Sequence, residues 1–177
     1  GRLEARIRDE KIPLGFDFVG QETTGIGGFT NALRTIPQME QIAKAVEQNA
    51  PDAWLINFSN PSGIVTEFLL NHTPLKAVGL CNLPIGTQER VSKLLGLPME
   101  QVRLETVSLN HCGAVTALHV GGENVLPQLL NSRMLDQAAQ QDAWIQNYRP
   151  IIELIRAIPN DYLQYFFYHG RKLTEQK

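Results

Sequence analysis

Two short apolar runs, each followed by a turn signal and a helical pattern, constrain the fold of this chain more than any other feature. The first run is Ala53–Phe58, which ends at Ser59-Asn60-Pro61, and the second is Lys76–Cys81, which ends at Asn82-Leu83-Pro84. Apolar runs of this length are typical of buried parallel strands. A strand, a helix, a strand and a helix in this order predict a parallel α/β sheet.

Three further segments precede the first strand. The charged stretch Arg2–Pro13 is expected to be a helix that stops at its proline. Gly20–Gly28 is dense in glycine and polar residues, which predicts a loop, but it matches neither the GxGxxG nor the GxxxxGK[ST] nucleotide fingerprint. Asn31–Asn49 repeats apolar residues at helical spacing, and Pro37 is expected to bend that helix or to mark its first turn.

The pattern changes after Pro98. Val102–Val107 alternates with the period of a half-buried strand, Thr116–Val120 is expected to be a further strand, and Val125–Tyr168 is expected to be mostly helical. We therefore expect a boundary within residues 83–100, with one domain over 1–90 and another over 91–177. The chain does not begin with Met, and its last residues form no obvious final helix or strand. We therefore expect a fragment of a longer enzyme that is inactive alone.

Charge and cysteine content exclude several classes of protein. Sixteen basic and eighteen acidic residues give a net charge of −2, which offers no reason to expect nucleic acid or an anionic membrane as a partner. The apolar stretches are too short to span a bilayer. Two cysteines in 177 residues form no disulfide framework, so a reducing compartment such as the cytoplasm is favoured.

Polar residues at the strand ends are the first candidates for a site, because ligands of open α/β sheets bind at the carboxyl ends of the strands. Asn60 can instead be a helix cap before Pro61. Cys81 and His111 form a possible metal pair for an open catalytic site, although a small core cysteine and a structural histidine are the alternatives. Cys112 is expected to be structural. The aromatic run Asp161–Tyr168 is expected on a helix, where a tyrosine can serve as a base.

Several motifs occur together in one order, and this order resembles glycoside hydrolase family 4, the NAD- and metal-dependent glycosidases. The motifs are Leu3-Glu4-Ala5-Arg6, Asp9-Glu10-Lys11-Ile12-Pro13-Leu14, Gly20-Gln21-Glu22-Thr23-Thr24-Gly25, Ile56-Asn57-Phe58-Ser59-Asn60-Pro61, Gly79-Leu80-Cys81-Asn82-Leu83-Pro84 and Leu109-Asn110-His111. The resemblance implies the C-terminal part of a Rossmann-like NAD-binding domain, without its glycine-rich start, followed by the beginning of an α+β substrate and metal domain.

The resemblance also implies an elimination–addition mechanism. NAD takes a hydride from C3 of the sugar, a divalent metal, usually manganese, polarises the C2 and C3 oxygens, and a tyrosine removes the C2 proton. The aglycone then leaves C1, water adds, and the hydride returns. The Cys-Asn-x-Pro form at Cys81-Asn82 favours 6-phospho-β-glucosidases, so the expected substrate is a phosphorylated disaccharide or an aryl 6-phospho-β-glucoside.

Individual roles carry over from the family to matching positions. Cys81 and His111 match the metal ligands. Arg6 matches a contact to the substrate phosphate, and Glu22 lies in the loop near the nicotinamide of the cofactor. Tyr162 is the expected base, with Tyr165 as the alternative. Three asparagines are expected to contact substrate: Asn60, Asn82 and Asn110. The family further implies a dimer or tetramer.

Three other functions remain open. An α-specific 6-phosphoglycosidase of the same family would cleave the other anomer. An NAD-dependent 2-hydroxyacid dehydrogenase would produce NADH on balance, and it needs a grouping of His, Asp and Arg that the sequence does not display. A non-catalytic sugar-phosphate-binding protein would bind its ligand without metal, so the change Cys81→Ala would leave binding intact.

Overall fold

The computed structural model describes residues 3–177, without the side chain of Ser132. Packing divides the chain into two compact units, which are described separately. Unit 1 holds the residues up to Cys81 together with Phe167–Lys177, and unit 2 holds Asn82–Phe166. Among the described residues, no helix is both long and apolar enough to cross a bilayer. The domains predicted at 1–90 and 91–177 concern the complete protein and stay a prediction.

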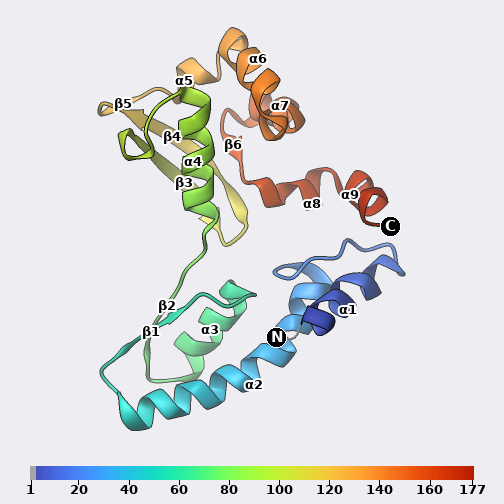
Figure 1. Cartoon of the computed structure of the whole chain (residues 1–177), viewed down its shortest axis with the longest axis vertical. Helices are drawn as coiled ribbons and strands as arrows, with labels where there is room; N and C mark the ends of the chain where they lie inside the picture. Colours follow the sequence, from blue (N-terminus) through green and yellow to red (C-terminus); the bar gives the residue numbers. More distant parts are fainter. Residues whose placement is uncertain (1–2) are drawn as a thin grey trace. The chain divides into compact units, whose positions relative to one another are not determined.

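Unit 1 contains the predicted parallel sheet. Strand β1 (Trp54–Asn57) pairs in parallel with β2 (Lys76–Gly79), and Asn57 lies opposite Gly79. Helix α3 (Ser62–His72) connects the two strands, as Figure 1 shows. The remaining helices of the unit are α1 (Leu3–Leu14), α2 (Gly25–Asn49) and α9 (His169–Gln176). The predicted strand–helix–strand order and the α/β class are confirmed.

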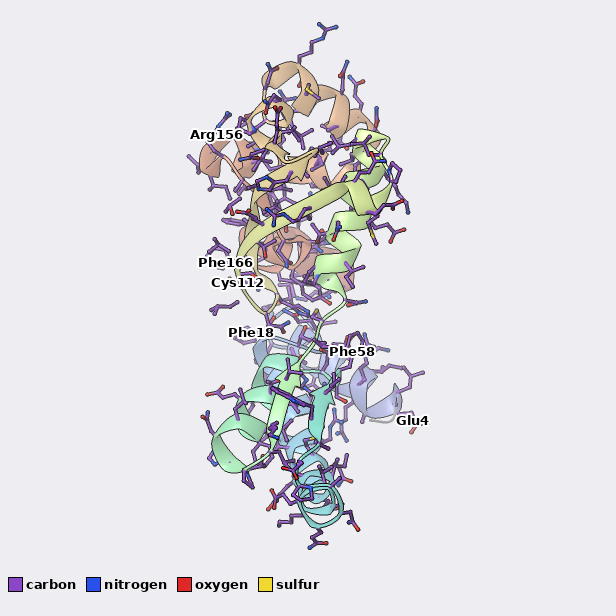
Figure 2. The ribbon with its side chains drawn as sticks, turned by 90° about the vertical axis from the view of Figure 1, so that its left-hand side faces the viewer. Glu4, Phe18, Phe58, Cys112, Arg156 and Phe166 are labelled. Carbon is purple, nitrogen blue, oxygen red and sulfur yellow. The ribbon has the colours of Figure 1, made fainter. Side chains whose placement is uncertain are left out.

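The core of unit 1 lies on one face of this sheet. Its buried residues come from α2, α3 and the β2 region: Met39, Ala43, Val65, Leu69, Leu75 and Ala77. On the other face, Trp54, Ile56 and Phe58 are 62–66 % exposed, and Figure 2 labels Phe58. The expectation of a fully buried strand is therefore wrong for β1, because within the described chain apolar residues cover only one face.

The glycine-dense segment is helical over its second half, which corrects the predicted loop. Helix α2 begins at Gly25 rather than at Asn31, and Pro37 lies inside it. A Cβ on Gly27 would lie 2.2 Å from the carbonyl oxygen of Gln21, so the preceding loop passes directly over the first turn of α2. Glycine serves here for close backbone packing. Helix α1 ends at Leu14, and the Arg2 end of its predicted range lies outside the described residues.

Unit 2 is built on an antiparallel hairpin. Strand β3 (Val102–Leu109) pairs with β4 (Cys112–Val120), which also pairs with β5 (Glu123–Asn124) and with β6 (Ile158–Pro159). Helix α4 (Leu83–Leu95) lies along the hairpin and is followed by the 3₁₀ turn η1 (Met99–Gln101) (Figure 1). Both predicted strands are confirmed, and each is longer than its sequence pattern indicated.

The C-terminal half of unit 2 is mostly helical, as predicted, but β6 interrupts it. The helices are α5 (Leu126–Leu129), α6 (Ser132–Gln141) and α7 (Ala143–Ile155), followed by the 3₁₀ turn η2 (Asp161–Leu163) and α8 (Gln164–Phe167). The aromatic run is thus divided between two short turns, and Phe166 is exposed. Trp144, Tyr148 and Ile152 of α7 are buried and anchor the core.

Candidate active site

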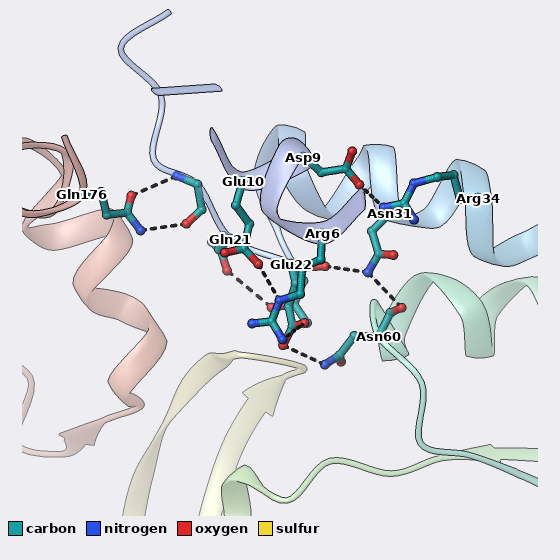
Figure 3. Close-up of polar contacts among 11 residues, drawn as sticks. Arg6, Asp9, Glu10, Gln21, Glu22, Asn31, Arg34, Asn60 and Gln176 are labelled. Carbon is teal, nitrogen blue, oxygen red and sulfur yellow. Dashed lines mark hydrogen bonds and ion pairs between the residues drawn. The ribbon is translucent and has the colours of Figure 1, made fainter. Parts of the chain in front are cut away.

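Unit 1 gathers three of the predicted site residues, Arg6, Glu22 and Asn60, in one polar cleft. The cleft has a volume of about 410 Å³. Its lining residues are Leu3, Arg6, Glu22, Asn31, Arg34, Thr35, Ser59 and Asn60. They come from α1, from the loop before α2, from α2 itself and from the loop after β1. Figure 3 shows Arg6, Glu22, Asn31, Arg34 and Asn60 among them.

Glu22 is the central acceptor of this cleft. Its Oε2 lies 3.1 Å from Nη1 of Arg6, and its Oε1 accepts a hydrogen bond from Nδ2 of Asn60 at 3.3 Å. Arg6 also donates from Nε to Oε1 of Glu10 at 2.7 Å. Because the Arg6 side chain is 54 % exposed, these ion pairs add little to folding stability and leave the guanidinium accessible to a ligand.

Asn31 and the Asp9–Arg34 pair support the cleft, and sequence reasoning missed all three. The side-chain amide of Asn31 donates to the carbonyl oxygens of Glu22 at 3.2 Å and Asn60 at 3.1 Å, so one residue holds both loops. Arg34 of α2 pairs with Asp9 of α1, whose side chain is almost fully buried. A buried charge needs such a partner, and the pair fixes α1, and with it Arg6, on α2.

The position of Asn60 corrects its alternative interpretation as a helix cap. Helix α3 begins at Ser62, and Pro61 occupies the cap position without a side-chain hydrogen bond. Asn60 instead directs its amide to Glu22. The loop that carries it is held by Asn57, which is buried and accepts a hydrogen bond from the Ser59 amide at 3.0 Å.

In unit 2, His111 occupies a conformation that a histidine rarely adopts. Asn110 and His111 form the two-residue turn between β3 and β4, where Leu109 pairs with Cys112. His111 has a φ of 60° and is only 7 % exposed. A left-handed residue other than glycine costs roughly 1–2 kcal/mol, and such strain clusters at functional sites. Asn110 is exposed beside it.

The ring of Tyr162 stacks on the ring of His111. Their centroids are 3.8 Å apart and their planes are inclined by 26°. The ring of Tyr165 lies 5.9 Å beyond Tyr162 and is tilted by 53° to it. The structure therefore brings together a tyrosine and a histidine that are far apart in sequence.

Cys81 and Asn82 stand at the division between the units. Cys81 is partly exposed and ends the first segment of unit 1, whereas Asn82 is exposed and directly precedes α4. Because Cys81 and His111 belong to different units, the Cys81–His111 metal pair stays a prediction. Cys112 is exposed at the start of β4 (Figure 2), so it does not have the core role expected of a structural cysteine.

The donors of this chain fit a divalent metal that is completed by other ligands. Imidazole binds borderline divalent ions, a thiolate adds one anionic donor, and manganese prefers oxygens for its other positions. Among the described residues, no group of three or more His, Cys, Asp or Glu side chains could hold a metal by itself.

Comparisons with known proteins identify the family of the chain. Residues 1–97 match the model of the family described as family 4 glycosyl hydrolase. A probable 6-phospho-beta-glucosidase of Bacillus subtilis is 38 % identical over 174 residues, which cover 94 % of this chain and 39 % of the relative. A phospho-alpha-glucosidase of Clostridium acetobutylicum is 32 % identical, with 99 % of this chain and 43 % of the relative covered.

A solved structure is similar over almost the whole chain. The 6-phospho-beta glucosidase of Thermotoga maritima, with manganese, NAD+ and glucose-6-phosphate, superimposes with a TM-score of 0.81 at 34 % identity. The match covers 99 % of this chain and 42 % of that one, so the chain spans about two fifths of the length of the relatives it matches. Taken with the family model, these matches show that the chain belongs to family 4 of the glycosyl hydrolases.

Proposed function

We propose that the complete protein hydrolyses 6-phospho-β-glucosides, such as phosphorylated disaccharides or aryl 6-phospho-β-glucosides. The observation that carries the proposal is the stack of Tyr162 on His111, which puts a candidate base beside a candidate metal ligand. The polar cleft of Arg6, Glu22 and Asn60 supplies groups of the kind that bind a charged sugar.

The proposed mechanism divides the work between named residues. Tyr162 removes the proton from C2 of the sugar, and the aglycone then leaves C1 with its bonding electrons. Arg6 binds the phosphate through its planar guanidinium. Glu22 would face the nicotinamide and the substrate when these bind. Hydrogen bonds to sugar hydroxyls come from the asparagines Asn60, Asn82 and Asn110.

Two bound groups would complete this chemistry. NAD would accept and return a hydride at C3, and a divalent metal, manganese in first place, would polarise the C2 and C3 oxygens. Cys81 and His111 would hold the metal. Because the hydride returns, water is the only reagent consumed, and the net reaction is hydrolysis.

The choice of the β-anomer rests on two supports. Asn82 follows Cys81 in the form associated with β-specific members, and the β-glucosidase of Bacillus subtilis is more similar to this chain than the α-glucosidase of Clostridium acetobutylicum. An α-specific activity is the second candidate, because α-glucosidases also match most of the chain. We further propose a cytoplasmic protein that assembles as a dimer or tetramer.

The test is an assay of the complete protein. p-Nitrophenol release from its 6-phospho-β-glucoside is measured under reducing conditions, with NAD+ and Mn²⁺ each present or omitted. The proposal expects release only when both are present, with no net NADH. Release that needs neither would point to conventional carboxylate catalysis. Cleavage of the α-anomer alone would favour the second candidate, and net NADH would favour a dehydrogenase.

A further inference from the structure

The three residues that precede Tyr162 are tied to their surroundings at both ends. We call Pro159–Asp161 the anchored segment. Trp144 donates from Nε1 to the carbonyl oxygen of Pro159 at 3.1 Å, and Tyr148 donates from its hydroxyl to the carbonyl oxygen of Asp161 at 3.0 Å. Both donors lie on α7 and are 4 % and 1 % exposed. Hydrogen bonds from buried donors of this kind help to fix the position of the backbone that accepts them.

Asn160, the middle residue of the anchored segment, connects Tyr162 to the strand that follows His111. Its backbone amide donates to the carbonyl oxygen of Gly113 at 2.8 Å. Its side-chain Oδ1 accepts a hydrogen bond from the backbone amide of Tyr162, also at 2.8 Å. Gly113 lies two residues after His111 in the same hairpin. Asn160 therefore links the backbone of Tyr162 to the hairpin that carries His111.

The hairpin at Gly113 has no room to adjust. A Cβ on Gly113 would lie 2.1 Å from Cβ of Ser108 and 2.5 Å from the carbonyl oxygen of Val107. The Asn160 amide therefore binds to a backbone position that is fixed by close packing between β3 and β4.

Trp144, the first of the two donors on α7, is held in turn by Arg90 of α4. Its guanidinium forms a bidentate pair with Asp142, at 2.6 Å from Nε and 2.8 Å from Nη2, and its Cζ lies 4.8 Å from the centroid of the Trp144 ring. Asp142 also accepts the backbone amide of Trp144 at 2.7 Å and so caps α7. The start of α7, and with it the indole donor, is fixed from two directions.

We propose that Asn160 and Tyr148 are positioning residues that hold the ring of Tyr162 over His111. The inference rests on the proposed function, in which Tyr162 is the base. A proton transfer requires donor and acceptor within hydrogen-bond reach, and a misplacement of about 1 Å can cost about 100-fold in rate. A merely structural role would lower stability without changing the proton-transfer step.

The experiment uses the complete protein with its cofactors. Asn160→Ala removes the acceptor for the Tyr162 amide, Asn160→Asp keeps an oxygen there, and Tyr148→Phe removes one hydroxyl. Tyr168→Phe, outside the anchored segment, is the matched control. We expect kcat for p-nitrophenol release to fall about tenfold in Asn160→Ala and Tyr148→Phe, with KM within about twofold, because one hydrogen bond is lost in each. Asn160→Asp and the control should stay within about twofold of wild type.

Two further readouts separate positioning from stability. With substrate deuterated at C2, the isotope effect on kcat should increase in Asn160→Ala and Tyr148→Phe, because proton removal limits the rate more strongly. In ligand-free crystals of Asn160→Ala, the Tyr162 ring should leave its stacked position 3.8 Å from His111.

The outcomes that overturn the inference are distinct from those that overturn the proposed function. An unchanged isotope effect in both variants, a loss in Asn160→Asp as large as in Asn160→Ala, or an unmoved ring in the crystals would each overturn it. Full activity of Tyr162→Phe would overturn the role of Tyr162 as base. The ring position in Asn160→Ala would then still decide whether Asn160 positions Tyr162.

Discussion

The two units arrange their candidate site residues by different physical means. In unit 1, Arg6, Glu22 and Asn60 meet through side-chain ion pairs and amide hydrogen bonds around an open cleft. In unit 2, backbone conformation brings His111 and Tyr162 together, through a left-handed turn residue and a segment anchored by hydrogen bonds. The half-exposed ion pairs of the cleft can adjust to a ligand and are screened by salt, whereas the stacked pair is fixed before a ligand binds.

This difference suits the two tasks that we propose for them. Binding of a charged sugar tolerates side chains that exchange partners when the ligand arrives. Proton removal requires a fixed distance between the base and the reacting carbon. Changes in the cleft of unit 1 should therefore affect KM first, and changes at the stacked pair should affect kcat first.

The largest expected effect comes from Tyr162→Phe in the complete enzyme. Phenylalanine can keep the stack on His111 but has no phenolate oxygen to accept the C2 proton. General base catalysis contributes typically about 10²- to 10⁴-fold, so we expect kcat to fall by about that factor with little change in KM. Steady-state kinetics of p-nitrophenol release measures both constants. If kcat falls by less than about tenfold, Tyr162 does not act as the base. The proposed division between binding in unit 1 and proton removal in unit 2 would then not hold.

Two glycine substitutions test whether close contacts between backbone segments stabilise only unit 2 or both units. In unit 1, a Cβ on Gly27 would lie 2.2 Å from the backbone carbonyl oxygen of Gln21. In unit 2, a Cβ on Gly113 would lie 2.1 Å from the Cβ of Ser108 and 2.5 Å from the carbonyl oxygen of Val107. We expect Gly27→Ala and Gly113→Ala each to lower the free energy of unfolding by about 3 kcal/mol. The effect at Gly27 would show that the Glu22 loop also depends on close backbone contact.

Gly86→Ala is the matched control for these glycine variants. A Cβ on Gly86 meets no atom within 4 Å, and the residue lies in α4, where alanine is favoured over glycine. Urea unfolding of the three variants measures the differences. If Gly27→Ala is as stable as Gly86→Ala, the loop before α2 adjusts more freely than its close packing indicates.

The sequence predicted the strand–helix–strand order of unit 1. It did not predict that Asn31 and Arg34 line the cleft, or how the stacked pair forms. Apolar runs bounded by turn signals identify β1 and β2 because burial pattern and strand period are local properties. Arg6 and Glu22 were expected from the family resemblance of their motifs, and Asn60 was expected also from its place at a strand end. The helical start of α2 at Gly25 was missed because glycine is a poor helix former, and only tertiary packing of the loop over Gly27 explains it.

Local patterns in the sequence do not predict the anchored segment. The short strand β6 is recognised only by its pairing with β4, which is more than 40 residues earlier in the chain. The sequence does not indicate the hydrogen bonds of the Tyr148 hydroxyl and the Trp144 indole, since their acceptors depend on the tertiary fold. Non-local hydrogen bonds leave no periodic signal in the sequence.

A change in ionic strength should have a smaller effect than these substitutions, and it tests the same difference between the two units. The Arg6–Glu22 pair is partly exposed, and raising the salt concentration from about 0.05 M to about 0.5 M screens charges at such sites. We expect KM of the phosphorylated substrate to rise about threefold while kcat stays constant, because Tyr162 acts within a fixed stack. Steady-state kinetics at both salt concentrations measures this, and Arg6→Gln should remove most of the dependence. A salt-dependent kcat would contradict the division of roles.

A last prediction concerns the Arg90–Asp142 pair, which supports unit 2 at the start of α7. Burial alone would raise the pKa of Asp142, but hydrogen bonds from Arg90 and from the Trp144 amide outweigh it and hold that pKa below the ordinary 3.8. Stability from a lowered carboxyl pKa is present above the unfolded value and is lost as pH falls through the folded pKa. Asp142→Asn should therefore cost about 1 kcal/mol of unfolding free energy at neutral pH, and this cost should shrink in acid.

Thermal unfolding at neutral pH and in acid measures this difference, with Asp52→Asn as the control. The Asp52 side chain is fully exposed and lies 3.9 Å from Lys76 in unit 1, so its substitution should leave the unfolding midpoint unchanged at neutral pH. A constant cost of Asp142→Asn at every pH would mean that the carboxylate charge contributes nothing. The cap on α7 would then act through its hydrogen-bond geometry alone, which asparagine can partly reproduce. In that case the stability of unit 2 would depend on hydrogen bonds to the backbone even at the Arg90–Asp142 charge pair. Unit 2 would then differ more clearly from unit 1, where ion pairs arrange the candidate site residues.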